Sequence, residues 1–316
     1  MLKNIIIKRL LKTAIAIASF SVIFLTIQPF FIIQSDFAAT TMIEGYSHLE
    51  KESLDVLFLG SSQMYFAVDA GKLTDEYGIS SYDFGAGAQH LPTTLYYLDE
   101  ALKTQTPKLV VLEVCGIFIK NSEVAESHLA WSYFPMPMSF KKFDSMYNSL
   151  NVGLIKSFEY SFVPLIRFHD KWKDTHLNDI DFVLNTYKYT DLKARGHVAE
   201  DHVTKCTIEY YNGDETTKEI PEESKKAILD IAERCREKGI KLLLLKTPVS
   251  DWTKGDSISV EQFALENNLE FIDLNENINE IGIDGDTDFY NKGHLNSSGA
   301  EKTTDYIAEI LKSCME

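Results

Sequence analysis

Basic residues are scarce in this sequence, and cysteine is rare. Of its 316 residues, 31 are Lys or Arg and 47 are Asp or Glu, so the formal net charge is -16. Binding to nucleic acid needs clustered Lys and Arg opposite the phosphates, and the composition therefore argues against a nucleic-acid partner. The four cysteines form no C-x-x-C pair, and the chain contains no zinc signature and no Gly-rich phosphate loop. We therefore expect neither a metal nor a cofactor.

The cysteines and one acidic loop leave two smaller questions. A domain of this size does not need disulfides, although Cys206 and Cys235 could pair in an oxidising compartment. Cys115 follows an apolar run and is expected to be a free core thiol. The acidic run at 284–288 lacks the glycine and the glutamate that an EF-hand loop requires, which argues against bound calcium.

The one long apolar run lies near the N-terminus. Residues 13–33 carry no charge, and about 20 apolar residues are enough for a helix to cross a bilayer. Four basic residues precede the run, namely Lys3, Lys8, Arg9 and Lys12. Basic residues before a span hold the N-terminus in the cytoplasm, so residues 1–34 are predicted to form a cytoplasmic tip and a transmembrane anchor, with the rest of the chain extracytoplasmic. A cleaved signal peptide is the alternative, but its apolar core is usually only about 7–15 residues long.

Beyond a polar connector at 35–53, short apolar runs alternate with helical patterns. Each run has the length of a strand and is mainly apolar, as in parallel strands that are buried on both faces. We expect strands at 54–59, 81–84, 109–114, 241–245 and 270–274, and helices at 66–77, 92–104, 221–238, 258–267 and 298–313. The last helix is expected to be capped by Ser298 in an S-x-x-E capping box. The predicted fold class is α/β, with a three-layer, flavodoxin-like parallel sheet in one domain at 54–316.

The alternation of strands and helices breaks between about 119 and 220. This stretch contains many aromatic residues and most of the histidines. We expect a large, partly helical insertion over the active edge of the sheet. Its aromatic residues form either a satellite hydrophobic cluster or a lid or groove that selects a substrate.

A candidate nucleophile and a candidate base lie at opposite ends of the predicted sheet. Ser62 follows the first strand in Gly60-Ser61-Ser62, and His294 precedes the last helix. A hydroxyl is a poor nucleophile until an imidazole removes its proton. Ligands bind at the carboxyl ends of parallel strands, so both side chains can reach the same edge. Each has a simpler explanation alone, as a helix cap or a loop histidine, but together they predict an acyl-handling site.

With these motifs the chain resembles the SGNH (GDSL-like) hydrolase superfamily over residues 54–118 and 221–313. Within it, the chain is similar to membrane-anchored members that work beside membrane-bound O-acyltransferases, in teichoic acid D-alanylation and alginate O-acetylation. The resemblance implies that Ser62 is the nucleophile and His294 the general base. It also implies that the turn after the second strand, with Gly87, Ala88 and Gln89, helps to form an oxyanion hole through backbone N–H groups.

Two positions depart from the family's oxyanion-hole pattern. Asp83 stands where the family has asparagine in its second block, and Ile117 stands where hydrolytic members place an oxyanion-hole asparagine. Losing one such donor costs about 2.7–4 kcal/mol, so hydrolysis is expected to be slow unless another donor such as Gln89 substitutes.

A third departure concerns the residue that orients the base. The family's Asp-x-x-His reads Asn291-Lys-Gly-His294 in this chain. An amide stabilises an imidazolium poorly, so Asp288, the nearest carboxylate in the sequence, is our candidate for the orienting residue. A Ser–His dyad without it, or a carbonyl supplied by Asn291, remains the alternative.

The expected function is serine-dependent acyl transfer, by an O-acyltransferase or an acylesterase, on a cell-envelope polysaccharide or glycopolymer. The resemblance implies a teichoic-acid-like acceptor and a membrane-bound O-acyltransferase as partners, at the cell membrane. Transfer is favoured over hydrolysis by the anchor, by Ile117 and by the family analogy. The alternative from another class is a catalytically inactive polymer-binding or scaffold protein of an envelope acylation system, which the departures at Asn291 and Ile117 support.

Overall fold

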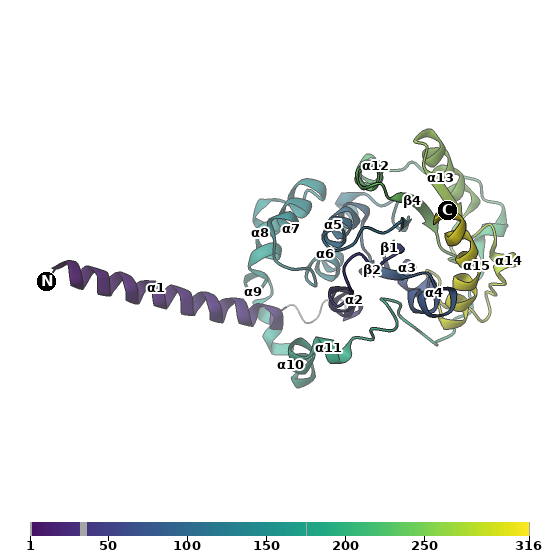
Figure 1. The fold of residues 1–316 in the computed structure, drawn as a ribbon. Coiled ribbons are helices and arrows are strands. Elements are labelled where there is room, and N and C mark those ends of the chain that lie inside the picture. The colour runs from purple at the N-terminus through teal and green to yellow at the C-terminus, as the bar shows by residue number, and fades with distance from the viewer. Residues whose placement is uncertain (1, 32–36, 175, 316) are drawn as a thin grey trace.

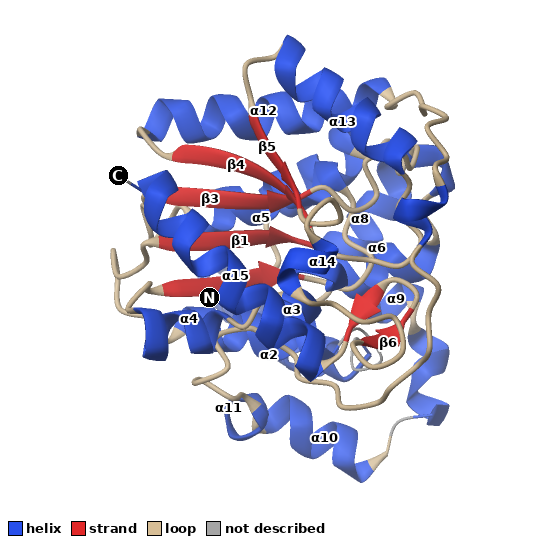
Figure 2. Cartoon of the chain, turned by 90° about the vertical axis from the view of Figure 1, so that its right-hand side faces the viewer, coloured by secondary structure: helices blue, strands red, loops and turns tan. Residues whose placement is uncertain are grey.

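Five parallel strands form the central sheet, in the order β2-β1-β3-β4-β5. The computed structural model describes residues 2–31, 37–174 and 176–315, and helices cover both faces of the sheet (Figure 1, Figure 2). The strands are β1 (Val56–Gly60), β2 (Ser81–Gly85), β3 (Leu109–Glu113), β4 (Lys241–Lys246) and β5 (Glu270–Asp273). The strand order is that of the flavodoxin-like fold, so the predicted α/β class and three-layer architecture are confirmed.

Two hydrophobic cores lie on the two faces of the sheet. Adjacent residues of a strand point to opposite faces, so Leu57 and Leu59 of β1 enter one core and Val56 and Phe58 enter the other. The first core is covered by α2 (Phe37–Ser47), α5 (Leu91–Ala101), α12 (Glu222–Lys238) and α13 (Lys254–Glu266). The second is covered by α3 (Ser62–Ala67), α4 (Ala70–Tyr77), α14 (Ile278–Ile281) and α15 (Ser297–Met315). Every central strand is therefore buried on both sides, which explains its unbroken apolar sequence.

Helix α1 (Leu2–Ile27) projects from the domain as a long rod that continues into the short turn η1 (Gln28–Phe31) (Figure 1). Within Ile5–Phe30, the most apolar stretch of 18 residues has a mean hydropathy of 2.1, and none of that stretch is buried in the domain. Its length and composition suffice to cross a bilayer. The predicted end of the span at 32–33 lies outside the described residues.

The segment predicted as a polar connector forms helix α2 instead. Ala39, Met42 and Tyr46 of this helix are buried, and the ring of Tyr46 stacks on Phe84 of β2 with centroids 4.3 Å apart. The hydroxyl of Tyr82 donates to the carbonyl of Met42 at 2.7 Å. The polar residues of α2 are partly exposed, whereas its apolar face covers the edge of the sheet.

Two predicted helix boundaries also need correction. The helix expected at 66–77 is two helices, because Asp69 begins α4 by accepting a hydrogen bond from the N–H of Lys72 at 2.9 Å. Ser298 does not cap α15. Asn296 accepts from the N–H of Gly299 at 3.2 Å, and the Ser298 hydroxyl donates to Asp288 instead.

The insertion between β3 and α12 is partly helical, as predicted. It contains α6 (Glu126–Tyr133), α7 (Phe140–Asp144), α8 (Leu154–Phe162), α9 (Pro164–Arg167), α10 (Leu177–Leu184) and α11 (Thr186–Tyr189), with the short turns η2 (Asn121–Glu123), η3 (Ser145–Ser149), η4 (His169–Asp174) and η5 (Glu209–Asn212). Helices α9 and α10 and the turn η4 contact η1 at the end of α1 (Figure 1). After α11 the chain returns past α3, where the N–H of Val198 bonds the carbonyl of Tyr65 at 3.0 Å.

Candidate active site

The turn after β1 requires glycine and then presents a serine. A Cβ on Gly60 would lie 2.9 Å from the Cβ of Glu113, and a Cβ on Gly85, its partner in the β1–β2 register, would lie 2.4 Å from the carbonyl oxygen of Gly60. The backbones of β1 and β2 therefore approach each other so closely at these two positions that a side chain would not fit. Ser61 is the N-cap of α3, and Ser62 is the first residue of that helix at the edge of the sheet.

His294 reaches Ser62 from a small hairpin far along the chain. The hairpin pairs β6 (Phe289–Asn291) with β7 (His294–Leu295) in antiparallel register, and β7 packs against α3. The Oγ atom of Ser62 lies 2.7 Å from Nε2 of His294. The ring of Phe66 meets the imidazole edge-on with centroids 5.1 Å apart. The predicted pair of Ser62 and His294 is thus brought into hydrogen-bond contact.

Asn291 occupies the other side of the imidazole. Its Oδ1 atom lies 2.9 Å from Nδ1 of His294 and also accepts the backbone N–H of Gly293 at 3.0 Å. A backbone N–H can only donate, so the atom shared by these two contacts is the amide oxygen. His294 then carries its proton on Nδ1, and its Nε2 lone pair is free to accept the proton of Ser62.

The prediction that Asp288 orients His294 is wrong. Asp288 is fully buried, and its carboxylate bonds the N–H of Asp284 at 2.7 Å, the hydroxyl of Ser298 at 2.8 Å and the ammonium of Lys302 at 2.6 Å. Burial raises its pKa, but the hydrogen bonds of Lys302, Asp284 and Ser298 outweigh burial and lower the pKa below its usual value. Asp288 therefore links the loop at 284–288 to the first turns of α15, next to the β6–β7 hairpin that carries His294.

The turn after β2 begins beside the serine, but Gln89 does not face the site. Gln89 is buried, and its Nε2 donates to the hydroxyl of Thr94 in α5 at 2.9 Å, which turns the side-chain amide toward the start of that helix. Ala88 has a φ of 48°, the left-handed region that non-glycine residues rarely adopt. The oxyanion-hole role of the N–H groups at Gly87 and Ala88 stays a prediction.

The two departures from the oxyanion-hole pattern lie in the core. Asp83 is opposite Phe58 in the register, two residues before the end of β2, and is 1% exposed. Burial raises its pKa well above the usual range, and nearby Asp69 adds to this effect. Ile117 is fully buried in the apolar core on the α5 side. Both side chains are buried in the domain, and Ile117 has no side-chain donor, so neither replaces the exposed asparagine donors of the family's pattern.

A buried ion pair below the serine was missed by the sequence reasoning. Lys246 ends β4 and Glu113 ends the neighbouring β3, and their side chains meet with Nζ and Oε1 2.6 Å apart. The ammonium also donates to the side-chain oxygen of Gln63 and lies 5.1 Å from the ring centre of Trp252. Glu113 in turn accepts the N–H of Cys115 at 2.8 Å. The available signal was one charged residue at the end of each of two adjacent apolar strands.

The electrostatic surroundings keep His294 neutral. Burial lowers the pKa of His294 and the positive charge of Lys246 lowers it further, and together they outweigh the negative charge of Asp251, which raises it. A neutral imidazole is the form that can accept the serine proton. Ser62, His294 and Asn291 therefore form a serine–histidine–asparagine line, in which a base is oriented by an amide carbonyl rather than by a carboxylate.

These features define the class of the protein as an α/β fold with a serine–histidine site at the carboxyl edge of its parallel sheet. No protein-family model matches the chain, and no curated protein sequence matches it. Among solved structures the fold is similar to that of a "putative acylhydrolase" from Bacteroides fragilis NCTC 9343, with 10% sequence identity and a TM-score of 0.42, over 86% of this chain and 95% of that chain. A similarity at this level assigns no residue roles, so the chemistry is argued from the site itself.

The four cysteines are free. Cys235 lies in the core on the α12 side, whereas Cys206 packs at the core on the α15 side, so the sheet separates the two thiols that were considered as a pair. Cys115, the predicted free core thiol, is free, but it is only partly buried and belongs to neither hydrophobic core. Desolvation raises its pKa to about 11, as expected of an unreactive thiol.

Proposed function

We propose that the protein is a membrane-anchored serine acyltransferase or acylesterase that acts on hydroxyl groups of a cell-envelope glycan or glycopolymer. The observation that carries the proposal is the 2.7 Å contact between Ser62 Oγ and His294 Nε2, with Nδ1 held by Asn291. This arrangement is the one that converts a hydroxyl into a nucleophile.

The first half-reaction acylates Ser62. His294 Nε2 takes the serine proton while Oγ bonds to the carbonyl carbon of the acyl donor, and the bond from that carbon to the donor's leaving oxygen breaks. The leaving oxygen takes the proton from His294, so the imidazole is neutral again. Backbone N–H groups at Ser62 and Ala88 are assigned to the oxyanion.

The second half-reaction decides between transferase and esterase. An acceptor hydroxyl attacks the acyl carbon, His294 removes its proton, and Ser62 Oγ leaves and recovers that proton. Asn291 cannot neutralise the imidazolium that forms in each step, which predicts slow turnover with water. An alcohol acceptor bound close to the acyl-enzyme gains the advantage of proximity over dilute attack, which favours transfer.

Location supports an envelope substrate. The apolar segment Ile5–Phe30 directly precedes the domain, and the basic residues at its start favour an extracytoplasmic domain. A membrane-bound O-acyltransferase would supply the acyl group at the same membrane, and the net charge of -16 fits no nucleic-acid role.

The experiment that tests the proposal is turnover of p-nitrophenyl acetate by the full chain, with and without a glycan acceptor. We expect release of nitrophenol that depends on Ser62 and rises with acceptor, together with acetylated glycan as product. Release of nitrophenol with only free acetate would make the protein an esterase. Equal release by wild type and Ser62→Ala would contradict the proposal.

The second candidate function is a catalytically inactive polymer-binding or scaffold protein. Two observations favour it: the amide in place of the acid beside His294, and the buried Ile117 at the position of an oxyanion-hole donor. Such a protein would bind glycan equally well as wild type and as Ser62→Ala, and neither form would turn over an ester.

A further inference from the structure

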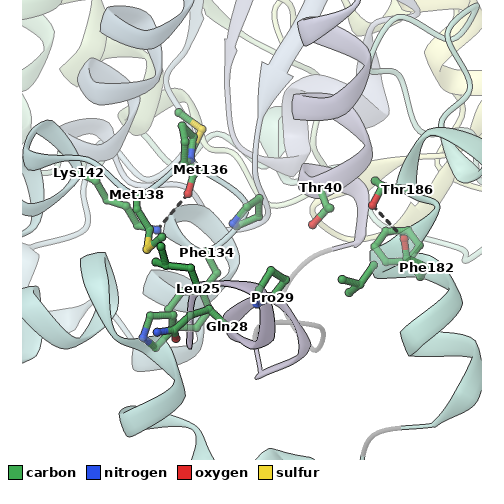
Figure 3. Close-up of a pocket in the computed structure, with 14 residues that line it drawn as sticks. Leu25, Gln28, Pro29, Thr40, Phe134, Met136, Met138, Lys142, Phe182 and Thr186 are labelled. Atoms are coloured by element: carbon green, nitrogen blue, oxygen red, sulfur yellow. Dashed lines mark hydrogen bonds between the residues drawn. The ribbon is translucent and has the colours of Figure 1, made fainter. Parts of the chain in front are cut away.

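A cavity lies where the end of helix α1 meets the insertion (Figure 3). Its volume is about 270 Å³, and neither Ser62 nor His294 lines it. The lining is mainly apolar, with Leu25, Phe134, Met136, Met138, Pro164 and Phe182. Sites for whole small molecules usually measure about 300–1,000 Å³, so this cavity suits one part of a larger amphiphile.

Lys142 places an unpaired cation in this apolar lining. The side chain is 2% exposed, and Figure 3 shows its ammonium bonded to the carbonyl of Met136, at 3.1 Å. Within the described part of the chain it has no other hydrogen-bond acceptor and no carboxylate within ion-pair distance, although the ring centre of Phe134 lies 6.0 Å away. Burial alone lowers the pKa of Lys142 to about 7. An ammonium has three donors, so two remain for a ligand.

Gln28 supplies a second buried donor from the end of the apolar helix. It is 2% exposed, and its Oε1 accepts the backbone N–H of Leu165 at 2.8 Å, which fixes the orientation of the amide. The Nε2 group has no hydrogen-bond partner among the described residues. A buried unpaired donor costs about 1–3 kcal/mol, and a ligand oxygen would recover that cost.

The cavity lies at the C-terminal end of the candidate membrane span, where the headgroup region of a bilayer would be. Leu25 and Gln28 lie at the end of the segment that is long and apolar enough to span a membrane, and η1 contacts α9 and α10 of the insertion. Helices α7 to α10 present side chains that are more than half exposed, namely Phe140, Leu154, Ile155, Ile166, Leu177 and Leu184. Exposed apolar side chains in the part of the domain that follows a candidate membrane helix are suited to contact with lipid rather than water.

From this combination we infer that the cavity binds the headgroup region of an anionic phospholipid from the membrane that holds α1. The phosphate oxygens accept hydrogen bonds from Lys142 and Gln28, and the upper part of one acyl chain packs against the apolar lining. Both groups have unused donors, and a negatively charged ligand would hold Lys142 in its protonated form, so an acceptor that carries negative charge is the matching ligand. The inference rests on the membrane location in the proposed function, but not on the chemistry at Ser62.

Native mass spectrometry of the full chain in detergent tests the inference, with phosphatidylglycerol and phosphatidylcholine added separately. We expect one phosphatidylglycerol to be retained per chain, and phosphatidylcholine to be retained much less. Lys142→Met should weaken phosphatidylglycerol retention about tenfold or more, because it removes a charged hydrogen bond. Gln28→Leu should weaken it roughly two- to tenfold, as expected for a neutral donor.

Lys141→Met is the matched control, because Lys141 is the next residue on α7 but its side chain is 56% exposed and faces Asp99. It should retain phosphatidylglycerol as wild type does. Equal retention of the two lipids by wild type overturns the inference without any variant, so a failure of Lys142→Met to fold does not remove the test. Equal loss in both lysine variants also overturns it, because it would indicate general surface attraction.

Two further outcomes separate this inference from others. Ser62→Ala should bind the lipid as wild type does, so loss of catalysis and loss of lipid binding are independent results. If the protein retains no lipid but copurifies with a membrane protein whose binding Lys142→Met abolishes, the cavity is a protein contact and the lipid assignment is wrong.

Discussion

Lys246 and Lys142 are both buried lysines, but they differ in how many hydrogen-bond and ion-pair partners surround the side-chain nitrogen. Lys246, 1% exposed at the catalytic edge, meets Glu113, Gln63 and the face of Trp252. Lys142, 2% exposed, lines the cavity at the end of the proposed membrane helix α1 (the membrane end) and has one backbone carbonyl as its acceptor among the described residues. In the first region the ammonium of Lys246 has its partners within the protein. In the second region Lys142 and the amide of Gln28 keep donors without a partner among the described residues. The difference indicates that the catalytic edge is preorganised and that the membrane end is shaped for an occupant.

The largest expected effect is on the rate of ester turnover, which should depend on the Ser62–His294 region and not on Lys142. His294→Ala should lower the rate of ester turnover by about 10⁴-fold, because the serine loses its general base. Lys142→Met should leave that rate unchanged in detergent. Initial-velocity measurements on both variants test this difference. A similar loss of rate in the two variants would mean that the two regions are coupled.

The next effect concerns stability and distinguishes a paired from an unpaired cation. Glu113→Ala leaves the ammonium of Lys246 buried without its carboxylate, which should lower the free energy of unfolding by about 3–5 kcal/mol. Denaturant titration of the full chain in detergent measures it. A loss below about 1 kcal/mol would mean that water reaches Lys246 and that the edge is less closed than the structure indicates.

The pH dependence tests which residue orients the imidazole. The pKa of His294 is lowered by burial and by Lys246, so activity should persist to a pH below about 6.5 and be lost as pH falls through the lowered value, where the base becomes protonated. Asn291→Asp should raise the midpoint by about 1–3 pH units, since a carboxylate stabilises the imidazolium. Asp288→Asn is the control: it should cost stability and leave the midpoint in place. A midpoint that moves with Asp288 would restore the original assignment.

The smallest expected effect is the stability change at the membrane end. Lys142→Met replaces a buried cation that lacks a counter-ion with an apolar chain of similar length, so the free energy of unfolding should stay within about 1 kcal/mol of wild type or rise. Denaturant titration without anionic lipid measures it. A loss as large as that of Glu113→Ala would show that Lys142 is already fully partnered.

The sequence predicted the sheet and the serine–histidine contact because both follow from strong local patterns. Parallel strands such as β1 are buried on both faces and read as unbroken apolar runs, and their carboxyl ends meet at one edge. The prediction that Asp288 orients His294 failed because it rested only on the preference of an imidazolium for a carboxylate over an amide. The hairpin register places Asn291 directly opposite His294, and Asp288 lies before β6. That register depends on a two-residue turn whose geometry the residue types did not reveal.

The membrane end could not be predicted from sequence. The burial of Lys142 results from packing of the loop at 134–138 against α7, within an insertion where the alternation of strands and helices breaks. The free amide of Gln28 depends on a contact with Leu165, far along the chain. Such long-range contacts in irregular segments leave no repeat in the sequence.

Reaction of the folded full chain with a fluorophosphonate, read by intact mass and peptide mapping, tests the central claim most directly. We predict a single adduct on Ser62, no adduct on Ser62→Ala, and much slower labelling of His294→Ala. Absence of an adduct on wild type, or an adduct elsewhere that persists in Ser62→Ala, would contradict the assignment of Ser62 and His294 as an acyl-handling site.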